Sequence, residues 1–251
     1  MIEQNRVNTE ELHRCAMLLA ERQMPDGWEL VASSGSARVA LHRENQVFYK
    51  EFLPRSPVET LKARLKGSRA TRARKHSEAL LIAGFDAPQN LAWGKLPGAR
   101  EYLFTRAVRG QGVDRWIRGA LASQGEASLA QRWRFLQELG VFIGRLHASG
   151  FTHGDLRTSN VLAHEGIDHF EFSLIDNERN RQQKPAAGKH LLKNLMQLNM
   201  HSSLELSRSD RWRFFRAWHS QMRDLSALEA KLIASQAYQW AMQRLRAKDS
   251  G

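Results

Sequence analysis

The spacing of hydrophobic and polar residues changes near the middle of the chain. In the first part, short segments with alternating or β-branched apolar residues are bounded by turn-like sequences, a pattern typical of strands. A basic helical stretch from about residue 57 to residue 83 interrupts them and ends at Gly84 and Pro88. These features predict an antiparallel sheet of five strands with one main helix, the strands being "WELVAS", "ARVALH", "QVFYKEF", "NLAWGKL" and "REYLFTRA".

After Arg106 the pattern becomes mostly helical. Five apolar residues recur at helical spacing and predict an amphipathic helix over residues 129–148. Two short strands, "NVLAH" and "FEFSLI", follow, and the remainder from about Ala187 predicts two or three helices. We therefore expect an α+β fold of two lobes, rich in strands in the first and mostly helical in the second. Its N-terminal lobe would comprise residues 1–106, including a helix near residues 9–24, and its C-terminal lobe residues 107–251.

The aromatic residues near the end of the chain allow two interpretations. They could form part of the core or a patch that faces lipid, and we expect the core. The residues concerned are Trp212, Phe214, Phe215, Trp218 and Trp240.

The chain is strongly basic. Lys and Arg number 38 against 26 for Asp and Glu, which gives a net charge of +12. Such an excess favours anionic partners. The stretch from Lys62 to Lys75 carries seven basic residues and no acidic one. It could be a solvated helix face, a docking surface for an anionic substrate or membrane, or a nucleic-acid site.

Cysteine content and hydropathy indicate the compartment. Cys15 is the single cysteine, so no disulfide can form within the chain, and a reducing compartment is expected. The polar N-terminal sequence does not resemble a signal peptide. The longest apolar run, from Ala79 to Phe85, is far shorter than the roughly 20 residues that span a bilayer. We expect a soluble, cytoplasmic protein that is at most attached to a membrane surface.

The most informative motif is "HGDLRTSNVL", which matches the pattern H-x-D-L-x-x-x-N of kinase catalytic loops. In that pattern an aspartate accepts the proton of the attacking hydroxyl, and the asparagine helps to hold Mg²⁺. Asp155 and Asn160 stand at these positions. Asp176 follows an apolar strand in "FSLIDNERN" and would be the second metal ligand, since Mg²⁺ prefers oxygen donors.

The N-terminal lobe contains candidates for nucleotide binding. Lys50 in "VFYK" ends the third strand, where kinases place a lysine that contacts the ATP phosphates. Glu78 on the following helix could orient Lys50, although a surface pair with Arg74 at i, i+4 is the alternative. The turn "SSGSA" would cover the phosphates with Ser33, Ser34, Gly35 and Ser36, but it has one glycine where the kinase pattern has three.

Together these segments resemble the bacterial lipopolysaccharide core-sugar kinases, the Kdo/WaaP family of the protein-kinase-like superfamily. The resemblance covers roughly residues 28–220 and rests on "YKEF", "LLIAGFDAPQNLAWG", "HGDLRTSNVL" and "LIDNERNR". It implies phosphorylation of a Kdo or heptose hydroxyl with ATP and Mg²⁺. It also implies an anionic glycolipid acceptor, peripheral contact with the inner face of the inner membrane, and no nucleic-acid partner.

Departures from the kinase pattern keep alternatives open. Gly154 stands where regulated protein kinases carry arginine, no A-P-E segment follows, and Asn177 and Glu178 replace Phe and Gly after Asp176. These differences argue against a peptide kinase. A phosphotransferase for a small molecule such as an aminoglycoside or choline is the second hypothesis, and a catalytically inactive kinase-like binding module is the third. For His153 we expect a structural role, bonding to backbone near the loop.

Overall fold

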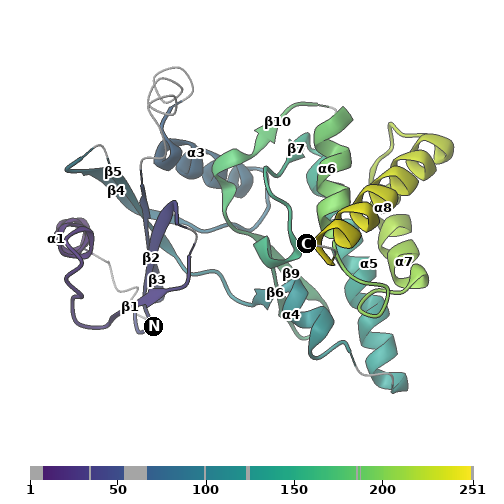
Figure 1. Cartoon of the computed structure of the whole chain (residues 1–251), viewed down its shortest axis with the longest axis horizontal. Helices are drawn as coiled ribbons and strands as arrows, with labels where there is room; N and C mark the ends of the chain where they lie inside the picture. Colours follow the sequence, from purple (N-terminus) through teal and green to yellow (C-terminus); the bar gives the residue numbers. More distant parts are fainter. Residues whose placement is uncertain are drawn as a thin grey trace. The chain divides into compact units, whose positions relative to one another are not determined.

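A computed structural model describes residues 8–33, 35–53, 67–98, 100–122, 125–184, 186 and 188–249. The chain divides into two compact units (Figure 1). The first comprises Met1–Ile82 and Ala87–Val108, and the second comprises Ala83–Asp86 and Arg109–Gly251. The division after Val108 lies two residues beyond the expected lobe boundary, and the short segment 83–86 belongs to the second unit.

The first unit contains the predicted five-stranded antiparallel sheet, in the order β1-β2-β3-β5-β4. Short turns join β1 to β2 and β2 to β3, so these strands are neighbours in sequence and in the sheet. Strand β5 pairs with β3 in a continuous register that places Lys50 opposite Leu103. The strands are β1 (Trp28–Val31), β2 (Ala37–His42), β3 (Val47–Phe52), β4 (Asn90–Leu96) and β5 (Arg100–Arg106).

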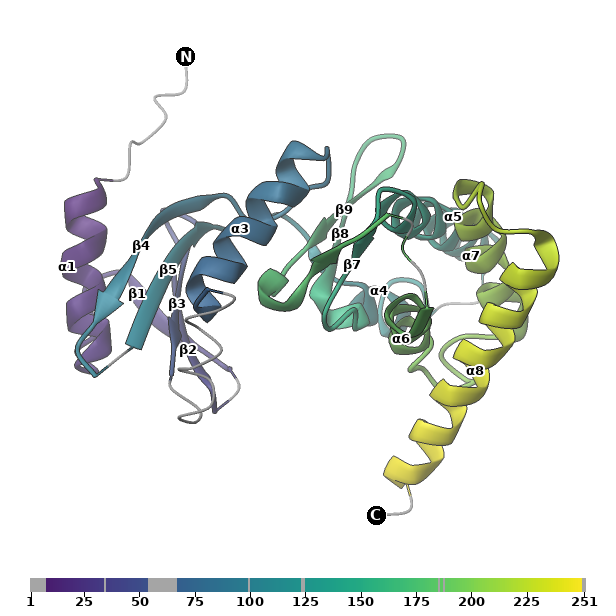
Figure 2. The same cartoon turned by 90° about the horizontal axis from the view of Figure 1, so that it is seen from above.

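Two helices cover opposite faces of this sheet, α1 (Thr9–Ala20) and α3 (Arg69–Ile82) (Figure 2). Successive side chains of a strand point to opposite faces. On β5, Tyr102 and Phe104 accordingly pack in the cluster with α1, while Leu103 packs with Phe52 and α3. Since Lys50 is opposite Leu103, it lies on the face that α3 covers.

A buried carboxylate joins the end of α1 to the sheet. Glu51 is fully buried and accepts hydrogen bonds at 2.9 Å from both Arg38 and Arg100. Both guanidinium groups also donate to the carbonyl of Ala20 at the end of α1. Burial and the adjacent Glu51 raise the pKa of Tyr49, whose hydroxyl donates to the same carboxylate. This network joins the end of α1, the β2–β3 hairpin and β5.

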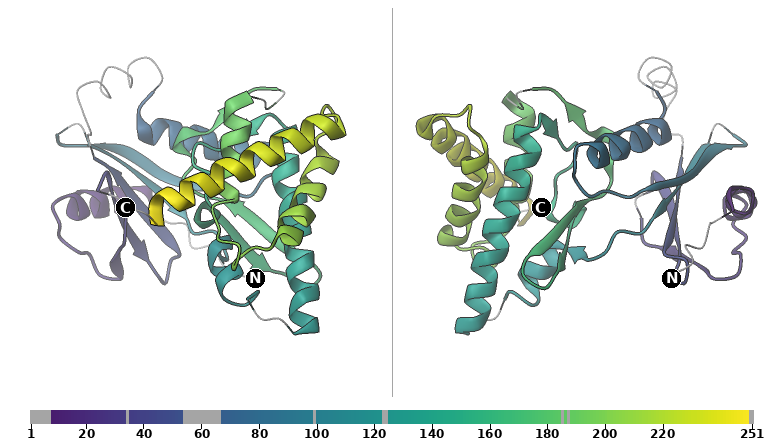
Figure 3. Two further views of the ribbon diagram at one scale, coloured as in Figure 1. Left: turned by 45° about the vertical axis from the view of Figure 1, so that its right-hand side comes forward. Right: turned by 180° about the vertical axis from the view of Figure 1, so that it is seen from behind.

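The second unit is mainly helical, with its long helix α5 at the centre. Gly140 and Gly144 lie one turn apart on α5, and a Cβ at either position would collide with the backbone of α7, at Phe214 O and Trp218 O respectively. The two helices therefore pack closely, and α8 packs against α6 and α7 (Figure 3). The helices are α4 (Val113–Arg118), α5 (Glu126–Ala148), α6 (Gly188–Leu198), α7 (Arg208–Gln221) and α8 (Ala227–Asp249).

Small strand pairs in this unit frame the HGDLRTSN segment. Strand β7 precedes the segment, β8 follows it, and β8 forms a hairpin with β9. Both 3₁₀ turns of the unit adjoin this region. The elements are β6 (Gln111–Gly112), β7 (Phe151–Thr152), η1 (Thr158–Asn160), β8 (Val161–Glu165), β9 (Phe170–Leu174), η2 (Asn177–Arg179) and β10 (Arg181–Gln182).

Candidate phosphoryl-transfer site

The HGDLRTSN segment, here called the catalytic loop (His153–Asn160), is a series of tight turns closed by its own hydrogen bonds. The N–H of Arg157 donates to Asp155 O at 2.9 Å, and the N–H of Asn160 donates to Arg157 O at 2.9 Å. The side-chain amide nitrogen of Asn160 also donates to Asp155 O, at 2.8 Å. The predicted base and the predicted metal ligand are thus coupled directly through the loop backbone.

Asp155 presents a carboxylate with its two oxygens in different environments. Oδ1 accepts from Arg157 Nε at 3.0 Å and from the amide nitrogen of Gln197 at 2.5 Å. Among the residues that the structure describes, no side chain or backbone group bonds to Oδ2. The side chain is 23% exposed. One oxygen is therefore held by protein and the other is left to accept a proton from a hydroxyl.

Two amide side chains of α6 hold the catalytic loop through hydrogen bonds. Gln197 accepts from the N–H of Leu156 at 3.0 Å while it donates to Asp155. Asn194, one turn earlier, accepts from the N–H of His153 at 2.9 Å and donates to His153 O at 2.6 Å. Both amides are buried, and each satisfies a donor and an acceptor of the loop.

His153 has the structural role expected from the sequence. Its Nε2 donates to Ile175 O at 3.0 Å, and its Nδ1 accepts from the N–H of Asp155 at 3.1 Å, which requires the neutral imidazole. Burial lowers the pKa of His153, and this outweighs the opposing influence of the Ile175 carbonyl and of the charges on Asp176 and Asp155. The imidazole therefore joins the catalytic loop to the end of β9.

Asn160 and Asp176 emerge at the same end of the β8–β9 hairpin. Val161 pairs with Leu174, and the N–H of Ile175 donates to Asn160 O at 3.0 Å, so Asp176 is the next residue along. Asp176 is exposed and has a left-handed backbone conformation (φ 60°, ψ 48°), which costs a non-glycine residue about 1 kcal/mol. Such strain is characteristic of functional positions.

The donors at this hairpin end fit Mg²⁺. The amide nitrogen of Asn160 is used by Asp155 O, so its oxygen is the atom left for a cation. A carboxylate from Asp176 adds a second hard oxygen, and Mg²⁺ in nucleotide sites is commonly held by one or two carboxylates with phosphate and water. Over the described residues there is no cluster of three His, Cys, Asp or Glu side chains with metal-binding geometry. An asparagine–aspartate pair completed by phosphate oxygens is consistent with that finding.

The residues after Asp176 explain the sequence departures. Asn177 donates to Leu174 O at 2.9 Å and accepts from the Asn180 side chain at 2.9 Å. A Cβ at Gly154 would overlap Cβ of Arg179, and the Arg179 carbonyl would lie 2.6 Å away. An arginine at position 154 would not fit, because the 177–180 turn occupies that space.

In the first unit, Lys50 and Glu78 make separate contacts. Lys50 is half-buried, with Nζ 5.3 Å from the centre of the Phe52 ring. The carboxylate of Glu78 accepts from Arg74 at 3.1 Å and from the Asn90 amide at 3.3 Å. Within the described ranges, the structure thus shows the i, i+4 alternative rather than the expected pairing of Glu78 with Lys50, because Arg74 lies one turn away on the same helix.

The turn expected to cover phosphates uses part of its polar groups internally. Ser33 Oγ donates to Ala37 O at 2.9 Å, and Ser36 O accepts from Arg69 at 2.9 Å. Gly35 has open space at its Cβ position and no left-handed φ, so glycine is not required there. Ser34 lies outside the described residues, as do Lys62, Arg64 and Lys66 of the basic stretch.

Sequence reasoning missed Arg157 and Gln197, which bond to the Asp155 carboxylate, and Asn194, which bonds to the backbone of His153. A signal for two of them was present. Asn194 and Gln197 fall among Leu191, Leu195 and Leu198 on α6, where the apolar face of the helix should be uninterrupted. Polar amides on a buried face need partners, and here the partners are the backbone and carboxylate of the catalytic loop.

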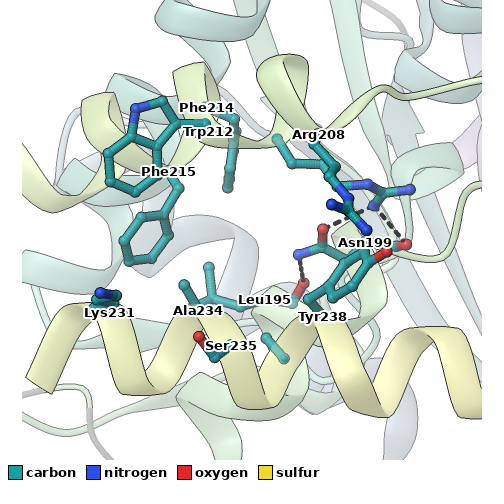
Figure 4. A pocket seen from close by; sticks show the side chains of 12 residues that line it. Leu195, Asn199, Arg208, Trp212, Phe214, Phe215, Lys231, Ala234, Ser235 and Tyr238 are labelled. Atoms are coloured by element: carbon teal, nitrogen blue, oxygen red, sulfur yellow. Dashed lines mark hydrogen bonds between the residues drawn. The ribbon is translucent and has the colours of Figure 1, made fainter. Parts of the chain in front are cut away.

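A separate cavity of about 370 Å³ lies among α6, α7 and α8 (Figure 4). Its walls are mainly apolar, and Arg208 and Lys231 bring positive charge to it. Trp218 is fully buried, as expected for a core aromatic residue, whereas Trp212 is 55% exposed and lines this cavity. Phe214 and Phe215 are buried and also line the cavity, so the expected core position is confirmed for these two residues and Trp218 but not for Trp212.

Comparison with known proteins found solved structures and a curated protein that are similar to this chain. A structure of WaaP in complex with acyl carrier protein superposes with a TM-score of 0.67 over 96% of this chain and 98% of that one, at 16% identity. WbdD bound to a kinase inhibitor matches with a TM-score of 0.49, 18% identity, and coverage of 88% and 46%. The KEOPS complex subunit Bud32 of Pyrococcus abyssi is 36% identical over 70 residues, which are 28% of this chain and 31% of that protein.

The family comparison covers most of the chain. Residues 34–218 match the model of the lipopolysaccharide kinase (Kdo/WaaP) family. This segment contains strands β2 to β5 of the sheet, the catalytic loop, Asp176 and the helix that supports the loop. The expected α+β kinase-like fold is confirmed by the sheet and by the WaaP superposition. The chain belongs to the lipopolysaccharide kinase (Kdo/WaaP) family of phosphotransferases.

Proposed function

We propose that this protein transfers the γ-phosphoryl group of ATP to a hydroxyl of Kdo or heptose in the lipopolysaccharide inner core. The observation that carries this proposal is the arrangement of Asp155. Its Oδ1 is held by Arg157 and Gln197, which leaves Oδ2 to accept the proton of an acceptor hydroxyl. A fixed carboxylate of this kind aligns the nucleophile, and alignment supplies much of the rate enhancement in phosphoryl transfer.

The other site residues have supporting roles in this proposal. Lys50 would contact the α- and β-phosphates of ATP. Asn160 and Asp176 would hold Mg²⁺, which when bound neutralises phosphate charge. His153 keeps Ile175 and therefore Asp176 in register with the loop through its bond to Ile175 O. Neutral His153 does this without adding charge beside the two aspartates.

The charge of the chain favours an anionic acceptor at a membrane surface. The net charge of +12 suits a glycolipid in an anionic leaflet, to which each nearby Lys or Arg contributes about 1 kcal/mol. None of the described helices is long and apolar enough to cross a bilayer. We propose that the protein acts on the cytoplasmic face of the inner membrane, where its excess of Lys and Arg would favour contact with anionic lipid.

The cavity beside α8 supports a further element of this proposal. Apolar walls with Arg208 and Lys231 suit an acyl chain with an anionic head. The similar WaaP structure is a complex with acyl carrier protein. We propose that an acylated partner occupies this cavity. Ala234→Trp would fill the cavity. This variant should no longer bind an acylated ligand, as measured by direct titration, while phosphoryl transfer to a delipidated core sugar persists.

Transfer of labelled γ-phosphate tests the main proposal. Dephosphorylated lipopolysaccharide core should become labelled in the presence of ATP and Mg²⁺, and Asp155→Asn should abolish labelling with ATP binding retained. Asn preserves the shape of the side chain and its contact with the loop but cannot accept the proton. Turnover by Asp155→Asn would contradict the role of Asp155.

Soluble acceptors in the same assay separate the alternatives. Labelling of aminoglycosides or choline in place of the core would favour a small-molecule phosphotransferase. ATP binding without transfer to any acceptor would favour a binding module. Lys193, whose Nζ donates to Gly154 O beside Asp155, brings positive charge to the catalytic loop and weighs against cationic acceptors.

A further inference from the structure

A group of cationic residues lies beside the catalytic loop, at the start of α6 and on β10. We call it the α6 basic cluster, which consists of Arg181, Lys189, His190 and Lys193. Desolvation lowers the pKa of His190, and the positive charges of Arg181, Lys189 and Lys193 lower it further. The charged groups that act on His190 are all cations. Lys189, His190 and Lys193 lie within five positions of one another on α6, and Arg181 lies on β10, which pairs with β7 just before the catalytic loop.

Backbone contacts place this cluster next to Asp155. Lys193 Nζ donates to Gly154 O at 2.9 Å, and Gly154 immediately precedes Asp155. Arg181 on β10 pairs with Thr152 on β7, two residues before Gly154. On α6, Lys193 lies one turn before Gln197, the residue that bonds to Asp155 Oδ1. Lys189 is one turn further, so the cluster extends roughly 6 to 12 Å along the helix from Gln197.

The outer members of the cluster lack anionic partners within the described part of the chain. Arg181 and Lys189 are exposed, and neither forms a salt bridge with a described carboxylate. Some cations of this unit are paired, among them Arg132 with Asp210 at 2.9 Å and Arg118 with Glu205 at 2.6 Å. Adjacent like charges repel one another, so the cluster creates a local positive potential that an anionic group would neutralise.

We propose that the α6 basic cluster binds an anionic substituent, a carboxylate or phosphate, of the sugar whose hydroxyl is presented to Asp155. This inference rests on the proposed function and adds the subsite that selects the acceptor. Because Lys189 lies two turns from Gln197 along α6, an anion bound by it would lie away from the hydroxyl that Asp155 contacts. A charged group bound there would orient the sugar, and a cationic acceptor would be repelled.

Direct binding measurements test the subsite without depending on turnover. The ligands are a Kdo-containing core oligosaccharide and its carboxyl-reduced, dephosphorylated counterpart, titrated calorimetrically without nucleotide. We expect the protein to bind the anionic form about tenfold more tightly, and Arg181→Ala/Lys189→Ala to lose this preference, because charge-assisted hydrogen bonds are removed. Lys193 is left intact because it holds Gly154.

Kinetics and a matched control complete the design. In the double variant, the KM for the anionic acceptor should rise about tenfold. We expect kcat and the KM for ATP to stay within about twofold. Arg244→Ala/Lys248→Ala removes the same charge from exposed positions on α8 and should leave all three parameters near those of the unmodified protein.

The outcomes distinguish this inference from the proposed function. Normal transfer to the core with unchanged acceptor binding in the double variant would overturn the subsite alone. A raised KM for ATP with an unchanged KM for the acceptor would assign the cluster to the nucleotide and also overturn it. An equal effect of the α8 control would show general electrostatic attraction. Binding of neither oligosaccharide, with transfer to a cationic soluble acceptor, would overturn both proposals.

Discussion

Gln197 donates its amide to Asp155 Oδ1 at 2.5 Å while it accepts from the backbone N–H of Leu156 at 3.0 Å. One side chain therefore sets both the carboxylate orientation and the backbone that carries it. Because Gln197 is on α6, the position of the proposed base depends on how this helix docks. The helix thereby connects packing in the core of the second unit with the geometry of the reaction.

Replacing Gln197 tests this connection. Gln197→Met keeps the size of the side chain and removes both hydrogen bonds. We expect kcat to fall about tenfold to a hundredfold, since small displacements of a catalytic group have effects of that size. The KM for ATP should change little, as measured by steady-state kinetics. Gln236→Met, at an exposed position on α8, is the control. Equal kcat values for Gln197→Met and the control would contradict the positioning role.

Gly154 should tolerate no side chain. Gly154→Ala places a Cβ against Arg179, and overpacking of this kind costs about 1 to 3 kcal/mol of the free energy of unfolding. Gly35→Ala meets open space in an ordinary backbone conformation and should change that free energy by less than about 0.5 kcal/mol. Urea denaturation of both variants gives the comparison. Similar stabilities would show that the 177–180 turn can move away.

Stability should decline in mild acid because of buried histidines. His147 is fully buried, accepts from Trp218 Nε1 at 2.9 Å and contacts Asn194 at 3.3 Å. Desolvation lowers its pKa from 6.5 to about 4. Between about pH 6.5 and 4, His147 is therefore protonated in the unfolded chain and neutral in the folded chain. The contribution of neutral His147 to the free energy of unfolding is complete above pH 6.5. As the pH falls towards 4, that free energy decreases by about 3 kcal/mol in total.

Denaturation in urea at several pH values between 4 and 7.5 measures this loss. His147→Gln removes the titrating group, so the free energy of unfolding should fall less steeply between pH 6.5 and 4 than in the unmodified protein. Burial also lowers the pKa of His153 and His201, which will contribute in the same direction. An identical slope for His147→Gln would contradict the assignment of His147.

The buried carboxylate of Glu51 should be essential to the first unit. Glu51→Gln removes the partner of Arg38 and Arg100, and breaking a buried ion pair costs about 3 kcal/mol or more. The matched control is Glu29→Gln, whose partner Arg43 is 74% exposed. That change should cost less than about 1 kcal/mol. Thermal unfolding followed by circular dichroism compares the two, and equal losses would contradict this account.

The sequence by itself determined the five strands of the first unit and the long helix α5, and it singled out the candidate residues of the catalytic loop, but it did not predict the short elements α4, β6, β7 and β10. Alternation of apolar residues predicted the five strands, because one residue in two must face a helix or a neighbour in the core. The spacing in "HGDLRTSN" identified Asp155 and Asn160, because the reaction needs a base and a metal ligand a short turn apart. Neither inference requires knowledge of which distant segments meet.

Only the tertiary structure decided which groups hold those residues. Asn194 and Gln197 are about 40 positions from the loop that they support, and local patterns carry no information on such pairings. Glu78 is a different case, since its sequence position suited either Lys50 or Arg74, and the structure shows the local i, i+4 pair with Arg74. Gly154 is explained by Arg179, which folding brings against it. The order of residues shows which side chains could take part in the reaction. Which groups hydrogen-bond to those side chains depends on how the helices and turns pack together.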